Sequence, residues 1–138
     1  MKAFGISVAV AAMAMAAPAH AQDRHAQDRE ERAQTAFAEL VEGRTAGEAT
    51  NCISTFQSNR LRVEEHVGLV YERGDTIWVA RTTNPRSLDQ WDVPVIERYG
   101  SQLCTHDVTR TIDRSSGMFS GVLFLEDFVP YTLDEAEG

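Results

Sequence analysis

The stretch VGLVYERGDTIWVAR, residues 67–81, decides the fold of this chain. Two runs rich in β-branched and aromatic residues, Val67–Glu72 and Thr76–Arg81, flank a polar segment that contains Gly74, and such runs are typical of strands. Glycine readily adopts the positive φ that a tight hairpin turn requires. The stretch therefore predicts an antiparallel hairpin whose second strand alternates between two faces. One face carries Ile77, Val79 and Arg81, and the other carries Trp78 and Ala80.

Four further runs on either side of the hairpin have the same strand-like texture. They are RLRVE at residues 60–64, VPVIERYG at 93–100, CTHDVTRTIDR at 104–114 and MFSGVLFLEDFV at 118–129. Most connections between them are short, and short connections favour antiparallel neighbours over the long crossovers of a parallel sheet. We therefore expect five or six antiparallel strands in a meander or a small, partly open barrel.

An amphipathic helix is predicted before the strands. Asp28 followed by Glu31 resembles a capping box at a helix N-terminus. An apolar stripe follows at the spacing i, i+4, i+7 and i+8, formed by Ala33, Phe37, Leu40 and Val41. Gly43 is a typical stop signal for a helix. We expect a helix of about 14 residues that gains its stability by packing this stripe on the sheet.

The chain is long enough for one domain with a core of its own and too short for two. We expect a mainly β fold of the α+β class, in which the N-terminal amphipathic helix precedes the antiparallel strands and one disulfide braces them. The single globular domain is predicted at residues 28–131. A mobile polar leader at residues 22–27 precedes it, and an acidic tail at residues 132–138 follows it.

The first 21 residues have the three-part pattern of a secretory signal peptide. Lys2 gives a positive start, Phe4–Ala17 is an apolar run, and Ala19-His20-Ala21 is a small-residue cleavage signal. The apolar run is shorter than the roughly 20 residues that a transmembrane helix needs. The pattern predicts a signal peptide at residues 1–21, cleavage after Ala21, no membrane span, and a periplasmic or secreted protein.

The chain contains two cysteines, Cys52 and Cys104. In an oxidising compartment such a pair normally forms a disulfide. A bond that closes a loop of this length stabilises a fold by about 4 kcal/mol on the chain-entropy model. The alternative is a metal site that combines Cys104 with His106, Asp107 and His66. In a strand, Cys104 and His106 could share one face, but Asp107 would point to the opposite face. The compartment favours the disulfide, and the metal site stays open as the alternative.

The formal net charge of −8 argues against two classes of partner. A non-specific nucleic-acid binder needs clustered basic residues that neutralise phosphates, and the arginines of this chain are scattered. An anionic membrane surface attracts basic segments for the same reason. The only lysine is Lys2, so a chain that begins at Gln22 has no lysine for a Schiff base or a phosphate-binding loop.

A set of short motifs resembles a group of small exported bacterial proteins that have no assigned activity. The motifs are GRTAG at 43–47, NCI at 51–53, GSQLC at 100–104, IDR at 112–114 and FVPY at 128–131. The resemblance implies export and a shared fold over residues 43–131, and it carries no reaction. Relatives of this kind often have a second cysteine pair near the positions of Asn84 and Val122. This chain has no cysteine there, which leaves Cys52 and Cys104 as the only pair.

Aromatic side chains are the best candidates for contact with a ligand, because they serve in binding sites as well as in cores. Trp91 is the first choice, since it lies in a polar loop that offers little burial, and Trp78 and Tyr99 follow. No catalytic residue and no cofactor is predicted, since the chain has no G-x-S-x-G elbow or comparable motif. We expect a non-enzymatic binding or envelope-associated domain with an unknown protein or small-molecule partner.

The alternative function is a small metal-binding protein or hydrolase that uses His66 and His106. A carboxylate such as Asp107 or Glu65 would complete a metal site if the two strands were adjacent, because imidazole and carboxylate groups are common ligands of transition metals. The two functions differ in one structural feature, which is whether the histidines converge with a carboxylate in a concave pocket.

Overall fold

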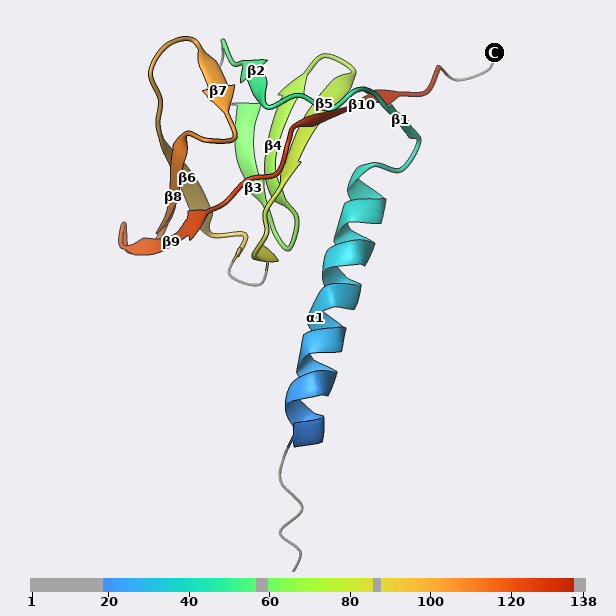
Figure 1. Cartoon of the computed structure of the whole chain (residues 1–138), viewed down its shortest axis with the longest axis vertical. Coiled ribbons are helices and arrows are strands. Elements are labelled where there is room, and N and C mark those ends of the chain that lie inside the picture. The colour runs from blue at the N-terminus through green and yellow to red at the C-terminus, as the bar shows by residue number, and fades with distance from the viewer. Residues whose placement is uncertain (1–18, 57–59, 86–87, 136–138) are drawn as a thin grey trace, which may run out of the picture.

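The computed structural model describes residues 19–56, 60–85 and 88–135. Most of the predicted signal peptide and the last three residues of the predicted tail lie outside these ranges. Within them, one helix and ten short strands form three layers (Figure 1). The elements are α1 (Ala19–Leu40), β1 (Arg44–Ala46), β2 (Cys52–Ser54), β3 (Leu61–Glu64), β4 (Gly68–Arg73), β5 (Thr76–Arg81), β6 (Asp92–Glu97), β7 (Gln102–Cys104), β8 (Val108–Asp113), β9 (Phe119–Leu123) and β10 (Val129–Leu133).

A five-stranded antiparallel sheet in the order β1-β10-β5-β4-β3 forms the middle layer. It contains the predicted hairpin as β4 and β5, and Arg73 pairs with Thr76 across the two-residue turn. Gly74 has a φ of 60°, the positive φ that a type II′ turn places at its first central residue. The predicted alternation is confirmed, because Val79 and Ala80 belong to core clusters on opposite faces of the sheet.

The turn between β3 and β4 brings two backbones unusually close. Gly68, the first residue of β4, has a φ of 154° and pairs with Arg81 of β5. A Cβ atom at this position would lie 2.2 Å from the carbonyl oxygen of Ala80, so only glycine fits. His66 in the same turn has a φ of 62°, a left-handed conformation that histidine adopts more readily than most non-glycine residues.

The helix α1 covers one face of the middle sheet. Ala33 is buried, and Phe37 and Leu40 pack against a valine-rich cluster of β4 and β5. The ring of Phe37 meets the ring of Tyr131 edge-on at a centroid distance of 5.8 Å, and the guanidinium carbon of Arg81 lies 4.9 Å from the centroid of the Phe37 ring. These contacts confirm the predicted apolar stripe.

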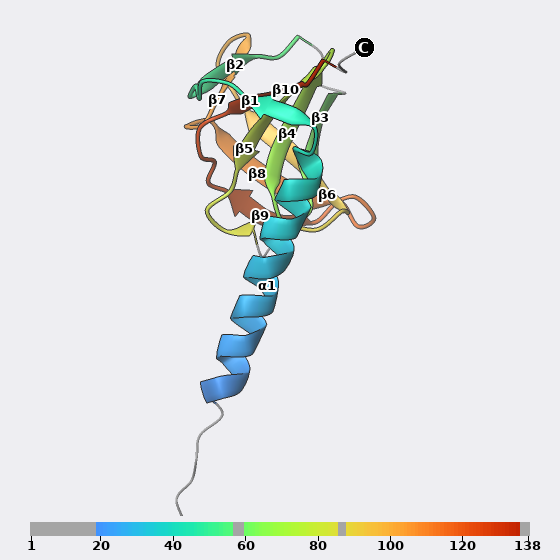
Figure 2. The same ribbon diagram turned by 90° about the vertical axis from the view of Figure 1, so that its right-hand side faces the viewer.

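The helix begins earlier than the sequence predicted. It starts at Ala19 instead of Asp28, so residues 22–27, predicted to be a mobile leader, are part of the helix. The physical reason is composition, because alanine, glutamine and arginine have high helix propensity and no glycine or proline interrupts the segment. The N-terminal half of α1 extends beyond the strands in both views (Figures 1 and 2). Within the described ranges, no helix combines the length and the apolar character needed to cross a bilayer.

Two smaller antiparallel sheets cover the opposite face of the middle layer. One has the strand order β6-β8-β9, and the other is the pair β2-β7. The predicted disulfide is present, because Cys52 and Cys104 lie directly opposite each other in the β2-β7 pair and their sulfur atoms are bonded. Their neighbours Ile53 and Leu103 join Leu69 of the hairpin in one core cluster, which ties this layer to the middle sheet.

Residues 118–129, predicted as one strand, form two segments. β9 ends at Leu123, and the chain then leaves the three-stranded sheet and enters the middle sheet as β10. On the way, Leu125 and Phe128 form isolated bridges with Thr82 and Thr50. The single-strand prediction was wrong because apolar alternation is the same in both sheets and does not show where a chain changes from one to the other.

The expected fold class is confirmed. The protein is mainly β with one N-terminal helix, all strand pairs in the described ranges are antiparallel, and one disulfide is present. The described strands form three separate sheets and do not close into a barrel. They outnumber the five or six expected, because β1, β2 and β7 are additional strands of only three residues and because residues 118–129 divide into β9 and the start of β10.

Candidate binding cavity

A cavity lies where the edges of two sheets meet. β3 is an edge strand of the five-stranded sheet, and β6 is an edge strand of the three-stranded sheet. In the described part of the chain these two strands lie close together without a hydrogen-bond ladder between them. Side chains from both sheets close this seam instead of backbone hydrogen bonds. The cavity has a volume of about 300 Å³. That volume is at the small end of the roughly 300–1,000 Å³ typical of ligand sites.

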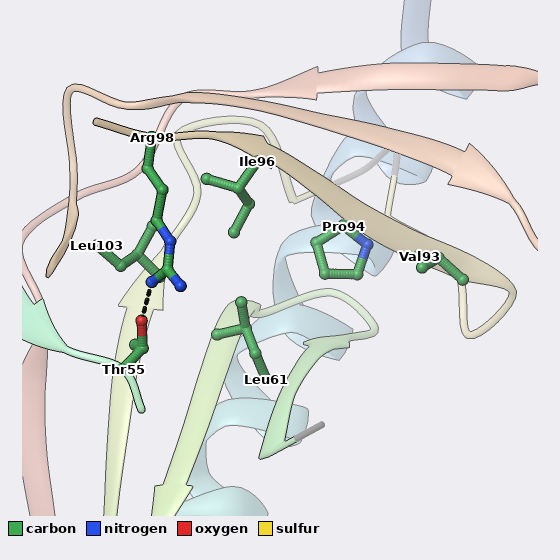
Figure 3. A pocket seen from close by; sticks show the side chains of 7 residues that line it. All are labelled: Thr55, Leu61, Val93, Pro94, Ile96, Arg98 and Leu103. Atoms are coloured by element: carbon green, nitrogen blue, oxygen red, sulfur yellow. Dashed lines mark hydrogen bonds between the residues drawn. The ribbon is translucent and has the colours of Figure 1, made fainter. Parts of the chain in front are cut away.

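The cavity is apolar along most of its length and polar at one end. It is lined by Thr55, Leu61, Val93, Pro94, Ile96, Arg98 and Leu103 (Figure 3). Leu61 of β3 and Ile96 of β6 point toward each other, and Val93 lies at one end. Arg98 and Thr55 lie at the other end, where Nη1 of Arg98 donates a hydrogen bond to Oγ1 of Thr55.

Strand alternation places Arg98 at the cavity. Pro94, Ile96 and Arg98 are two residues apart, so an extended chain turns their side chains to the same face. That face is the inner one, because Thr111 and Thr109, the β8 partners of Pro94 and Ile96, are buried. A guanidinium group therefore continues an apolar row just past the end of β6.

The disulfide fixes the polar end of the cavity. Thr55 directly follows β2 and Leu103 lies within β7, and the bond between Cys52 and Cys104 joins these two strands. Thr55 is only 6% exposed, and its hydroxyl oxygen accepts the hydrogen bond from Arg98. The covalent link therefore holds the residue that orients the guanidinium.

The surroundings of Arg98 differ from those of Arg62 and Arg110. Arg62 and Arg110 each form ion pairs with glutamates. No ion pair in the described ranges includes Arg98, and one threonine hydroxyl is the acceptor found for its five N–H donors. A positive charge thus borders an apolar cavity without a carboxylate from the described residues to balance it.

The three predicted aromatic contacts lie apart from this cavity and from one another. Trp78 lines a separate cavity of about 240 Å³ together with Arg73. Tyr99 is fully exposed and lines a third pocket of about 310 Å³. Trp91 is 52% exposed in the turn directly before β6. Their role as ligand contacts stays a prediction, because none of them borders the cavity at the seam.

The structure does not bring His66 and His106 together. His66 lines a groove beside α1, and its Nε2 lies 3.3 Å from Oε1 of Glu65. His106 lines a different pocket with Asp107, whose carboxylate accepts the backbone N–H of Cys104 at 2.8 Å. The proposed metal site at Cys104 is wrong, because that sulfur is bonded in the disulfide. Among the described residues, no group of three histidine, cysteine, aspartate or glutamate side chains is placed to hold a metal ion.

Sequence reasoning missed the residues of this cavity. Arg98 carried a usable signal, because it falls on the same alternating face as Pro94 and Ile96, and an inward-facing charge is unusual in a strand. Thr55 and Leu61 carried no such signal. They are brought to the cavity by the meeting of β3 and β6, which no local pattern shows.

Comparisons with family models, with curated proteins and with solved structures gave no match. The resemblance to small exported bacterial proteins therefore stays a prediction. Four of its motifs form two strand pairs in the structure. Residues 43–47 and 128–131 meet through β1 and β10, and residues 51–53 and 100–104 meet through β2 and β7. These motifs thus contribute to the scaffold that surrounds the cavity.

Proposed function

We propose that the protein is an exported, non-enzymatic domain that binds a small, mainly apolar molecule in the cavity between β3 and β6. The observation that carries the proposal is the apolar lining of that cavity, to which both larger sheets and β7 contribute. Water in an apolar cavity finds few polar partners. A ligand that fills it therefore gains the free energy of removing apolar surface from water.

Export is supported by two features of the chain. Residues 1–21 have the pattern of a cleaved signal peptide. A structural disulfide is typical of proteins in oxidising compartments such as the periplasm or the medium outside the cell. The ligand would accordingly be a molecule of the cell envelope or its surroundings.

Binding is favoured over catalysis by the chemistry of the lining. Among the described residues that line the cavity, Thr55 and Arg98 are those whose side chains carry polar groups. A guanidinium group stays protonated in proteins, so Arg98 does not serve as a general base. A threonine hydroxyl needs an adjacent base to act as a nucleophile, and its partner here is the same guanidinium.

A fluorescent dye tests the proposed binding. N-phenyl-1-naphthylamine is neutral, and its emission rises when it moves from water to apolar surroundings. We expect saturable binding of one dye molecule per chain. Pro94→Trp should abolish binding, because Pro94 lies on the inner face of β6 and the indole would extend into the cavity. Pro94 belongs to neither core cluster, so this substitution leaves the core packing in place.

Val95→Trp is the matched control. Val95 follows Pro94 in β6 and faces the opposite side of the strand; it is 38% exposed and does not line the cavity. The V95W variant should bind the dye as the wild type does. Absence of saturable binding by the wild-type chain, or equal binding by P94W and V95W, would contradict the proposal.

A further inference from the structure

We infer that the ligand of this cavity carries a carboxylate and that Arg98 is the residue that recognises it. The inference rests on the proposed binding function and adds the chemical class of the ligand. That class is a small organic acid, in which one carboxylate is attached to an aliphatic or aromatic body.

The first argument is the hydrogen-bonding capacity of Arg98. A guanidinium group presents five N–H donors in a planar fork that matches the two oxygens of a carboxylate. The hydrogen bond to Thr55 uses one nitrogen and orients the group at the end of the cavity (Figure 3). The remaining donors have no acceptor among the described residues, and a carboxylate can accept two of them in parallel.

The second argument is the distribution of polarity along the cavity. Among the described residues that line it, Arg98 is the only charged one; it lies at one end, and Leu61, Ile96 and Val93 continue away from it. A molecule with a carboxylate at one end and an apolar body fits this arrangement in a single orientation. The volume of about 300 Å³ limits that body to a small one.

The third argument concerns competition from the protein's own acids. Glu97 is the nearest carboxylate in the sequence, but it pairs with Arg110. The net charge of −8 repels anions at long range. That repulsion is screened over a Debye length of about 8 Å at physiological ionic strength. Arg98 is exposed, but a carboxylate hydrogen-bonded to its guanidinium lies well within one Debye length, so the local positive charge decides the preference.

Displacement of N-phenyl-1-naphthylamine by two matched pairs of compounds tests the inference. The first pair is decanoate and decanol, and the second is 4-phenylbutyrate and 4-phenylbutanol. We expect each acid at neutral pH to bind the wild-type chain about 10- to 100-fold more tightly than its alcohol, the range expected for a hydrogen bond to a charged group. Tighter binding of decanoate assigns an aliphatic body and tighter binding of 4-phenylbutyrate an aromatic one, and both results support the inference.

Arg98→Gln should remove the preference for the acids by a comparable factor and leave the binding of the alcohols within about twofold. Arg114→Gln is the matched control, because Arg114 is exposed and does not line the cavity. It should leave all four affinities unchanged. Arg98→Lys keeps the charge but loses the planar fork, so its preference for the acids should be intermediate.

The outcomes separate this inference from the function on which it rests. Equal binding of acids and alcohols by the wild-type chain overturns the inference, and so does dye binding that none of the four compounds displaces. Acid binding by R98Q at the wild-type level overturns the role of Arg98. Failure of the wild-type chain to bind the dye or any compound overturns the proposed function itself. The comparison of acids with alcohols on the wild-type chain needs no variant, so it tests the inference even if R98Q fails to fold.

Discussion

Gly68 is the residue whose replacement should be most damaging to the middle sheet. Gly68→Ala places a methyl group against the backbone carbonyl of Ala80, which cannot move without breaking the pairing of β4 with β5. The positive φ of 154° adds backbone strain for any residue with a side chain. We expect the free energy of unfolding to fall by about 3 kcal/mol or more, as measured by urea denaturation.

Gly43→Ala is the control that separates the two causes of the loss expected for G68A, the close contact and the backbone strain. Gly43 also has a positive φ, 67°, but a Cβ atom there would meet nothing within 4 Å. Its replacement should cost only the roughly 1–2 kcal/mol of a left-handed conformation in an L-residue. Equal losses for G43A and G68A would contradict the explanation from close contact.

Asp113 is a titratable anchor of the turn between β8 and β9. Its Oδ1 accepts hydrogen bonds from the side chains and backbone N–H groups of Ser115 and Ser116, which lower the pKa of Asp113 from 3.8 to about 2. Because the pKa is lower in the folded chain, the ionised carboxylate favours folding. This contribution is complete well above pH 3.8 and is lost as the pH falls through about 2.

Ser115→Ala removes the largest cause of this shift. The pKa of Asp113 should rise toward 3.8, which a ¹³C NMR titration of the side-chain carboxyl group can measure. Ser101→Ala, a serine outside the turn, should leave the titration unchanged. A midpoint near 3.8 in the wild-type chain would show that the serine hydrogen bonds do not hold in solution.

Among the elements, the β2-β7 pair depends most on a covalent bond. Each strand has three residues, and an isolated two-stranded pair is marginally stable at best. The disulfide joins residues that are 52 positions apart. Changing Cys52 and Cys104 together to alanine should lower the free energy of unfolding by about 4 kcal/mol on the chain-entropy model, as measured by urea denaturation.

The same double variant should also bind the dye more weakly than the wild type, because Thr55 and Leu103 lose the link that holds them at the cavity. Reducing agent supplies the control, since it should weaken binding by the wild-type chain and leave the double variant unchanged. A loss of stability below about 1 kcal/mol would show that the pair forms without the bond.

Elements whose signals lie within one segment could be predicted from the sequence. The hairpin was predictable because both strands and the glycine of their turn fall within residues 67–81. The face of the helix that carries Phe37 was predictable because 3.6-residue periodicity is a local property. The disulfide was predictable because the chain has a single cysteine pair and the pattern of a signal peptide.

Elements that depend on distant partners could not be predicted. β1 and β2 lie in a stretch with the composition of a loop and become strands because β10 and β7 pair with them. The start of α1 was misplaced because the capping signal at Asp28 lies inside a longer segment of good helix formers. The cavity could not be predicted either, because Leu61 and Ile96 are distant in the sequence and meet only after both sheets have formed.

For the whole molecule, the proposed export predicts the mass that intact-protein mass spectrometry should measure. Expressed with its leader in a bacterium, the protein recovered from the periplasm should have the mass of residues Gln22–Gly138 less two hydrogen atoms. Cleavage after Ala21 shortens α1 by its first three residues. Ala36, Phe37 and Leu40 are the described helix residues that pack against the sheet cluster, and all follow the cleavage point, so the fold should be unaffected.

A reagent for free thiols checks the same sample. No cysteine should react with it before the disulfide is reduced. Two other results would contradict the prediction. One is retention of residues 1–21 in the recovered protein, and the other is accumulation of the chain in the cytoplasm with two reactive thiols.

The position of β10 has a consequence for how the chain is made. This strand comes almost last in the sequence, yet it lies inside the five-stranded sheet, between β1 and β5. A ribosome-bound chain that stops before Val129 lacks the strand that carries Tyr131 to Phe37 of α1. The sheet is therefore completed only when synthesis is nearly over. This order suits the proposed export, because a polypeptide whose sheet is still incomplete can pass through a narrow translocation channel before the last strand is added.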